Sequence, residues 1–279
     1  MTKSRGFTLI ELIMVIVIMG IISAAAAVFI RGPIEGYVAA NRRAQLSDSA
    51  DIAIRRLSRD VRLALPNSVR VGGGSQFLEY IPTTTGSRYR ADGGGDILDF
   101  TNALDSSFDY LGASIEGATG FLVVFNTGQR SLAGCGTAPG GADAYENCNR
   151  RATTGITAST VSFTATANPL PFTSPGHRVH VVPSTGPITF ACENVNTSAA
   201  GTLRIYTGYQ TTNADWGSAA PASAPAGGTV SLLAESVSAC SFNYAPINAA
   251  NGLVTILLTL TRSNETVTLH HQVHVDNAP

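Results

Sequence analysis

The sequence predicts an α+β protein in which one long N-terminal helix packs on an antiparallel, β-rich globular head. Three observations support this: an apolar run over residues 7–30, a helical stripe that continues to Leu65, and short apolar or alternating segments over the rest of the 279 residues. About 210 residues follow the helix, enough for a hydrophobic core. We divide the chain into residues 1–6 (leader), 7–30 (transmembrane or filament-core helix), 31–66 (amphipathic stem helix) and 67–279 (head).

The apolar run contains an acid. Between residues 7 and 30 the only polar side chains are Thr8, Glu11 and Ser23, and the run is long enough to cross a bilayer as a helix. A carboxylate at the centre of such a helix costs roughly 3 kcal/mol, and less near its end. Either Glu11 reaches the head groups and has no further role, or it pairs with a positive charge on another protein.

A short basic leader precedes this run. Lys3 and Arg5 are followed by Gly6-Phe7-Thr8-Leu9-Ile10-Glu11, which resembles the class III signal of type IV pilins and pseudopilins. The resemblance implies that prepilin peptidase cleaves after Gly6 and that Phe7 becomes the N-methylated terminus. It also implies that Glu11 attracts the terminal amine of a neighbouring subunit. Two such charges are costly alone in a low dielectric and much less costly as a pair.

The same residues allow an ordinary signal peptide. Lys3 and Arg5 then form the basic region, residues 7–22 the apolar region, and residues 23–27 a cleavage site with small side chains. A secreted β-rich binding protein remains on this interpretation. Glu11 interrupts the apolar region, however, and the helical pattern continues beyond Ala27, so we favour the pilin-like interpretation.

Membrane orientation follows from the leader. Lys3 and Arg5 stay in the cytoplasm, while a long C-terminal region crosses largely regardless of its charge. We therefore expect a single-pass inner-membrane protein with a periplasmic head. The resemblance implies that the protein then moves into an extracellular pilus.

The stem carries one apolar stripe. Asp51 and Arg55 add an i,i+4 pair with the acid first, which is the favourable order. Gly32-Pro33 and Gly36 should loosen or kink the helix, and Pro66 should end it. The stripe consists of Ala50, Ile54, Leu57, Val61 and Leu65.

The head contains candidate strands separated by Gly, Pro, Asn and Ser. The last two form the clearest antiparallel hairpin, with Ser263-Asn264 as the turn and with alternating apolar residues on one face of each strand. Those faces are Val254, Ile256, Leu258 and Leu260 on one strand and Val267, Leu269, His271, Val273 and Val275 on the other. The candidate strands are residues 77–81, 96–100, 121–125, 161–164, 178–182, 188–192, 203–209, 230–233, 239–244, 253–262 and 266–275.

Four cysteines lie in the head. An even number of cysteines in an exported protein predicts two disulfides, and three pairings are possible. We favour the sequential pairs Cys135–Cys148 and Cys192–Cys240. Loop closure would then contribute roughly 3 and 4 kcal/mol to stability.

Charge is sparse and unevenly distributed. Only 13% of the residues are charged, and Lys3 is the single lysine. Residues 31–70 contain eight arginines and four acids (+4), whereas residues 71–279 contain eight arginines and fourteen acids (−6). Such a basic stem and acidic head suit contacts between stem and head or between subunits. Nucleic acid is not an expected partner, because the basic residues alternate with acids.

No pattern in the chain predicts an enzyme, a metal site or a cofactor. The acids Asp92, Asp96 and Asp99 around a glycine triplet lack the spacing of a calcium loop. No Gly-x-Ser-x-Gly, Walker A or dinucleotide-binding motif is present. We interpret the histidines as polar-face residues of strands, since His270 and His274 are about 13 Å apart along one strand. The histidines are His177, His180, His270, His271 and His274.

Residues 51–71 narrow the resemblance. An arginine-rich helix end followed by Leu65-Pro66-Asn67-Ser68-Val69-Arg70-Val71 is similar to the larger minor pilins, above all those of the mannose-sensitive haemagglutinin (MSHA) type, and to the J-like pseudopilins of type II secretion. The implied partners are major and minor pilins, prepilin peptidase, the inner-membrane assembly platform and, before assembly, the lipid bilayer. One departure is Val28, which stands where many major pilins have a helix-breaking proline.

Overall fold

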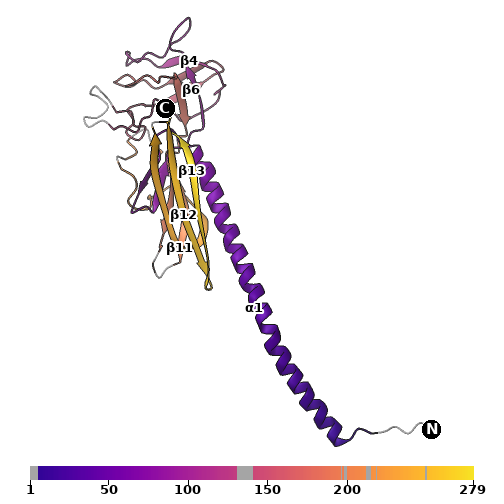
Figure 1. Ribbon diagram of the computed structural model, residues 1–279. Coiled ribbons are helices and arrows are strands. Elements are labelled where there is room, and N and C mark those ends of the chain that lie inside the picture. Colours follow the sequence, from indigo (N-terminus) through magenta and orange to yellow (C-terminus); the bar gives the residue numbers. More distant parts are fainter. Residues whose placement is uncertain are drawn as a thin grey trace, which may run out of the picture.

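The computed structural model describes residues 6–130, 141–195, 197, 200–211, 215–217, 219–248 and 250–279. A single helix, α1 (Leu9–Arg62), has 54 residues and extends far beyond the head (Figure 1). At 1.5 Å per residue it is about 80 Å long. The long helix and the antiparallel sheets of the head confirm the predicted α+β class.

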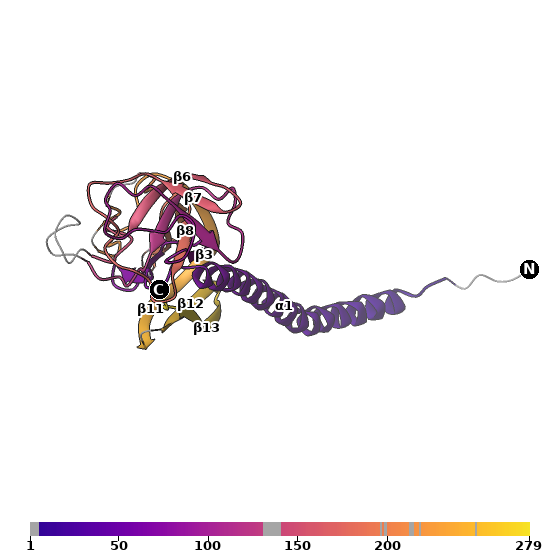
Figure 2. The same cartoon turned by 90° about the horizontal axis from the view of Figure 1, so that it is seen from above.

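α1 continues without a break through Pro33, where the sequence predicts loosening or a kink. Pro33 lacks an N–H, so one helical hydrogen bond is missing there. Figure 2 shows that the helix bends partway along its length. A proline therefore weakens this helix locally but does not end it.

The helix ends at Arg62, earlier than the predicted end at residue 66. The reason is that the next residues form an isolated β-bridge, Ala64↔Pro82, with the segment after β2 (Phe77–Tyr80). The Leu65 N–H donates to the Ile81 carbonyl at 2.7 Å, and the Thr83 N–H donates to the Leu63 carbonyl at 2.7 Å. Backbone pairing with residues 81–83 thus replaces the last predicted helical turn.

Seven antiparallel strands form one large sheet behind α1. Their order is β1 (Arg70–Gly72), β2 (Phe77–Tyr80), β9 (Ile188–Glu193), β10 (Gly201–Thr207), β11 (Thr229–Asn248), β12 (Asn251–Arg262) and β13 (Glu265–Asp276). α1 packs against β11, β12 and β13 (Figure 1).

The helical stripe and the hairpin meet in the main core. All five predicted stripe residues are buried, as are Leu46 and Ala53 on the same side of α1. On the hairpin the buried residues are Val254, Ile256, Leu258, Leu260, Val273 and Val275. The period-3.6 and period-2 patterns therefore identified the two surfaces that pack together.

The predicted hairpin is confirmed. β12 and β13 pair from Asn251↔Asp276 to Arg262↔Glu265. Ser263 and Asn264 have φ values of 49° and 67°, which is the left-handed pair that a two-residue hairpin turn requires.

β11 is one strand where the sequence predicts two. It pairs with β10 through residues 229–237 and with β12 through residues 237–248. Register shifts lie near the changeover, and Ser236 there has a positive φ of 59°. A β-bulge thus bends a single strand at the polar residues that looked like a gap.

The head contains a second unit that the sequence does not reveal. Six strands form a closed barrel in the order β3 (Thr85–Tyr89), β4 (Ser107–Leu111), β7 (Thr160–Phe163), β6 (Arg150–Ile156), β5 (Phe121–Val124) and β8 (Arg178–Val182). The barrel has its own core, which includes Tyr89, Phe108 and Val181. Figure 1 shows it at the end of the head farthest from the N-terminus.

The barrel is an insertion between two neighbouring strands of the sheet. β2 and β9 pair with each other, and Tyr80 at the end of β2 lies opposite Ile188 at the start of β9. The chain therefore leaves the sheet, forms the barrel and returns to the next position. The predicted head of residues 67–279 consists of a sheet and this inserted barrel.

One predicted strand is wrong and four strands were missed. Residues 96–100 form no strand; Leu98 is buried in the barrel core from a loop, and its N–H donates to the Arg90 carbonyl. The missed strands β1, β3, β4 and β6 are short or rich in polar residues. Their pairing follows from closure of the barrel and the sheet edge rather than from local propensity.

Aromatic and polar side chains join the barrel to the sheet. The guanidinium of Arg150, from β6, is fully buried and stacks on the Trp216 ring at 3.3 Å. The Asn67 amide donates to the Asn126 carbonyl at 2.8 Å and to the Asn277 carbonyl at 2.9 Å. The helix end, the barrel and the C-terminus are therefore linked at one junction.

A disulfide joins Cys192 in β9 to Cys240 in β11, with a Cα–Cα distance of 6.0 Å. It lies in the main core and matches the sequential pairing. Cys135, the expected partner of Cys148, lies outside the described residues.

The amino-terminal helix as candidate functional site

The predicted cleavage site precedes α1. Gly6 and Phe7 lie outside the helix, and the Phe7 side chain is 82% exposed. A Cβ atom added to Gly6 would meet no other atom within 4 Å. The fold therefore does not require glycine at position 6, and the Gly6–Phe7 peptide bond is open to a protease.

Thr8 and Glu11 form a capping box at the start of α1. The Glu11 carboxylate accepts hydrogen bonds from the Thr8 N–H and the Thr8 hydroxyl, both at 2.9 Å, and the Glu11 N–H donates to the Thr8 oxygen at 3.4 Å. These bonds satisfy backbone groups that a helix start leaves without partners. They also hold the carboxylate near the N-terminal end of the helix, where the helix dipole favours an anion.

Sequence reasoning identified Glu11 but missed its local partner. The signal was available in Thr8-Leu9-Ile10-Glu11, because a threonine three residues before a glutamate at the start of an apolar helix is typical of a capping box. Within one subunit Thr8 thus provides the polar contacts of Glu11.

The first half of α1 is apolar on every side, and its large apolar side chains are not buried by any part of the chain that the structure describes. Leu9, Ile16, Ile21 and Phe29 are each more than 60% exposed. Within the described residues α1 is the one helix long and apolar enough to span a membrane, and none of its most apolar stretch is buried. This half of the helix needs lipid or other proteins around it.

The second half of α1 is amphipathic and attached to the head. Leu46 is the first buried residue of α1, and Arg43 forms an ion pair with Glu265 at the start of β13. On the outer face Asp51 and Arg55 form the predicted ion pair, with an N–O distance of 2.6 Å. The stem is therefore joined to the head both by apolar packing and by opposite charges.

The histidines and acids weighed in the sequence lie outside the N-terminal segment that carries Gly6, Phe7 and Glu11. His177 contacts the Tyr89 ring, His180 is in β8 of the barrel, and His270 and His274 are exposed on β13. The Asp99 carboxylate accepts hydrogen bonds from the backbone and hydroxyl of Thr101. Across the described residues no three His, Cys, Asp or Glu side chains are grouped to hold a metal ion.

Comparison with known proteins gives a match at the start of the chain. Residues 1–27 match the family model described as the prokaryotic N-terminal methylation motif. This motif implies processing by prepilin peptidase, and together with the apolar helix it fits an inner-membrane precursor. No curated protein and no solved structure shows significant similarity to the chain.

Proposed function

We propose that this type IV pilin-like protein is a minor pilin of an MSHA-like pilus. Prepilin peptidase cleaves after Gly6, and residues 7–30 hold the protein in the inner membrane with its head in the periplasm. The assembly platform then moves the subunit into the filament. At or near the tip it aids the initiation of assembly or attachment to surfaces.

The unburied apolar half of α1 is the observation that carries this proposal. A peptidase that cleaves after Gly6 leaves the whole helix on the mature protein. Each Leu, Ile or Phe on it gains roughly 1.5–3 kcal/mol when removed from water. Lipid covers these side chains before assembly, and the helices of other pilins cover them in the filament.

Glu11 supplies the polar contact in that apolar bundle. After cleavage, the amine of Phe7 becomes a positive charge, and each charge in the bundle needs a partner of opposite sign. The Glu11 carboxylate of one subunit attracts the amine of the next. In the free subunit, the hydrogen bonds from Thr8 keep Glu11 satisfied until this partner arrives.

The inserted barrel favours a place at the tip. It adds bulk at the end of the head farthest from the N-terminus of α1 (Figure 1). In a filament whose subunits repeat closely, that bulk would crowd the neighbour in the next layer. A low-copy position at the tip leaves the barrel exposed for contacts with a surface.

The alternative is a J-like pseudopilin of a type II secretion system. The methylation motif and the exposed helix suit both machines, because both assemble subunits through an apolar helical bundle. The neighbouring genes distinguish them: pilus genes support the minor pilin, whereas genes for a secretin and exported enzymes support the pseudopilin.

The replacement Glu11→Ala tests the assembly role. We expect normal membrane insertion and at least ten-fold less protein in sheared pili, as measured by immunoblotting of membranes and pili. Asp48→Ala is the matched control, because Asp48 is an exposed acid on the same helix outside the apolar segment. Incorporation of the Glu11 variant at the level of the control would contradict the proposed mechanism.

A further inference from the structure

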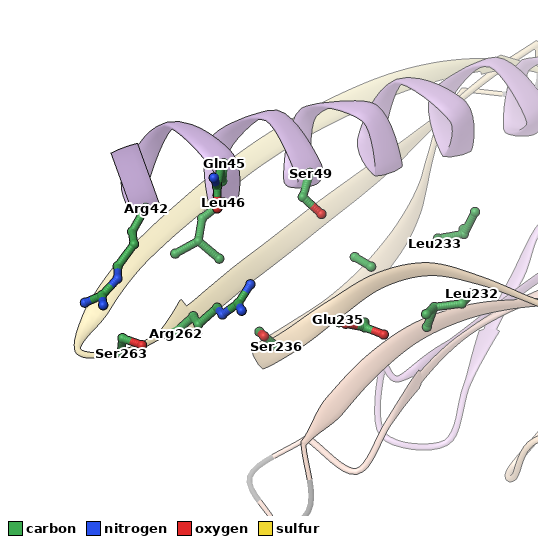
Figure 3. Close-up of a pocket in the computed structure, with 11 residues that line it drawn as sticks. Arg42, Gln45, Leu46, Ser49, Leu232, Leu233, Glu235, Ser236, Arg262 and Ser263 are labelled. Carbon is green, nitrogen blue, oxygen red and sulfur yellow. The ribbon is translucent and has the colours of Figure 1, made fainter. Parts of the chain in front are cut away.

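A groove lies where α1 leaves the head (Figure 3). One wall is α1, with Arg42, Gln45, Leu46 and Ser49; the others are residues 232–236 of β11 and the end of the β12–β13 hairpin. Its volume is about 460 Å³. A water molecule in the liquid occupies about 30 Å³, so the groove has room for side chains rather than a single small ion.

Two arginines stand at one end of the groove. Arg42 extends from α1 and Arg262 from the end of β12, so the two guanidiniums come from opposite walls (Figure 3). Neither guanidinium has a hydrogen bond or ion pair with any described residue. In contrast, the guanidinium of Arg43 pairs with Glu265. Glu235 is the only acid among the lining residues.

The rest of the groove offers an apolar contact. Leu46 on the α1 wall is buried, whereas Leu232 on the β11 wall is 49% exposed. The groove thus combines a pair of charge-assisted hydrogen-bond donors with an apolar surface. This combination suits a carboxylate next to an apolar side chain, as in an acidic peptide segment.

The position of the groove identifies the partner. The exposed apolar surface of α1 continues through Ile34, Tyr37 and Val38, and Arg42 follows one turn later, about 6 Å along the axis. The proposed function requires neighbouring subunits to cover that surface, so they also come within reach of the groove. The head of this chain itself carries net negative charge, because residues 71–279 sum to −6, so a neighbour with a similar head offers carboxylates to the two arginines.

We propose that the groove binds an acidic segment of a neighbouring pilin subunit. A carboxylate of that segment accepts hydrogen bonds from Arg42 and Arg262, and an adjacent apolar side chain packs on Leu46 and Leu232. The inference rests on the proposed function, since it places other pilins beside α1. It adds a second contact between subunits, at the base of the head, to the contact made by the apolar helices.

Photo-crosslinking in whole cells tests this site in the full-length chain. A photoreactive amino acid replaces Gln45, which is exposed at the groove, and mass spectrometry identifies the crosslinked peptide. We expect a pilin peptide that contains Asp or Glu. The yield should fall at least ten-fold with Arg42→Gln/Arg262→Gln and stay unchanged with Arg59→Gln/Arg62→Gln, which removes the same charge from α1 beyond the groove. Reversing the identified acid to Arg together with Arg42→Glu/Arg262→Glu should restore the crosslink.

The same cells separate failure of this inference from failure of the proposed function, because sheared pili are assayed in parallel. Protein in pili without a crosslink to an acidic segment, or with a crosslink that the arginine variants leave unchanged, overturns the groove contact alone. An arginine-dependent crosslink without protein in pili overturns only the pilus assignment. Binding of inorganic phosphate to the detergent-solubilised chain, lost in the Arg42/Arg262 variant without any such crosslink, overturns a subunit as the occupant.

Discussion

The two halves of α1 belong to one continuous helix but find their apolar partners in different places. From Leu9 to Val38 the apolar side chains are exposed on all sides, whereas from Leu46 to Val61 one stripe is buried against the sheet. The first half has a continuous apolar surface and the second a face about one third of the helix wide. The difference shows that a single apolar stripe can be buried within the chain, whereas a helix that is apolar on every side needs partners outside it.

The two halves of α1 also differ in their proposed roles, since one serves the assembly of subunits and the other the folding of the head. The stripe fixes the orientation of the head on the helix, and the ion pair of Arg43 with Glu265 lies where the attachment begins. Farther towards the N-terminus, the large apolar side chains of α1 from Leu9 to Val38 are exposed in the described structure. A substitution in one half should therefore affect the stability of the head, and a substitution in the other should affect the assembly of subunits.

The largest expected effect is on the buried half of α1. Leu57→Ala should lower the free energy of unfolding of the head by about 2–5 kcal/mol, because Leu57 is fully buried and its truncation leaves a cavity. Denaturant unfolding of the full-length protein in detergent measures the change.

Ile16→Ala provides the matched comparison in the other half. Ile16 is 62% exposed, so the head should unfold at the same denaturant concentration as the native protein. If both variants destabilised the head equally, the division of α1 into an assembly half and a folding half would be wrong.

The head and the exposed helix should respond differently to acid. The first histidine of the chain is His177, so the helix contains none. Burial, with a smaller effect of Arg178, lowers the pKa of His180 from 6.5 to about 4, while Asp276 opposes the shift. The unfolded chain therefore binds more protons between pH 6.5 and 4, and the head loses stability as the pH falls through this range. The loss is at most about 3 kcal/mol.

Thermal unfolding at several pH values checks this effect. His180→Asn should flatten the dependence on pH between 6.5 and 4, whereas His274→Asn, at an exposed position of β13, should leave it unchanged. An unaltered slope in the His180 variant would show that another group titrates.

The smallest effect concerns the solvent side of the stem. Asp51→Ala removes the ion pair with Arg55, whose side chain is 75% exposed. Surface i,i+4 pairs contribute about 0.3–0.5 kcal/mol, so the unfolding midpoint should barely change. The change should be smaller still at high salt, because salt screens the pair. A loss of stability as large as that of Leu57→Ala would mean that the outer face of the stem stabilises the head as much as the buried stripe does.

Local patterns predicted the helix, its stripe and the last hairpin, because each depends on neighbours in sequence. Val254 to Leu260 and Ser263-Asn264 show this for the hairpin. Its alternation and turn lie within the 26 residues from Asn251 to Asp276, which comprise β12, the two-residue turn and β13. The barrel could not be predicted in the same way. Its strands include Thr85–Tyr89 and Arg150–Ile156, which look polar, and Thr85–Tyr89 pairs with β8, far away in the sequence.

The candidate functional residues were also predictable only where they are close together in the sequence. Gly6, Phe7 and Glu11 form a contiguous motif, so the sequence alone identified them, and Thr8 was recognisable from the same six residues. The groove was not, because Arg42 and Arg262 are 220 positions apart and meet only when the hairpin packs on α1. Long-range pairing is decided by the tertiary fold, which periodicity does not encode.

The most direct test of the account is the N-terminus of the mature protein purified from its membrane or pili. Intact mass and N-terminal sequencing should show a chain that begins with N-methylated Phe7 and retains Glu11 and the whole of α1. A mature chain that begins at Val28 or nearby would contradict the account, because the exposed half of the helix would then be a discarded signal peptide.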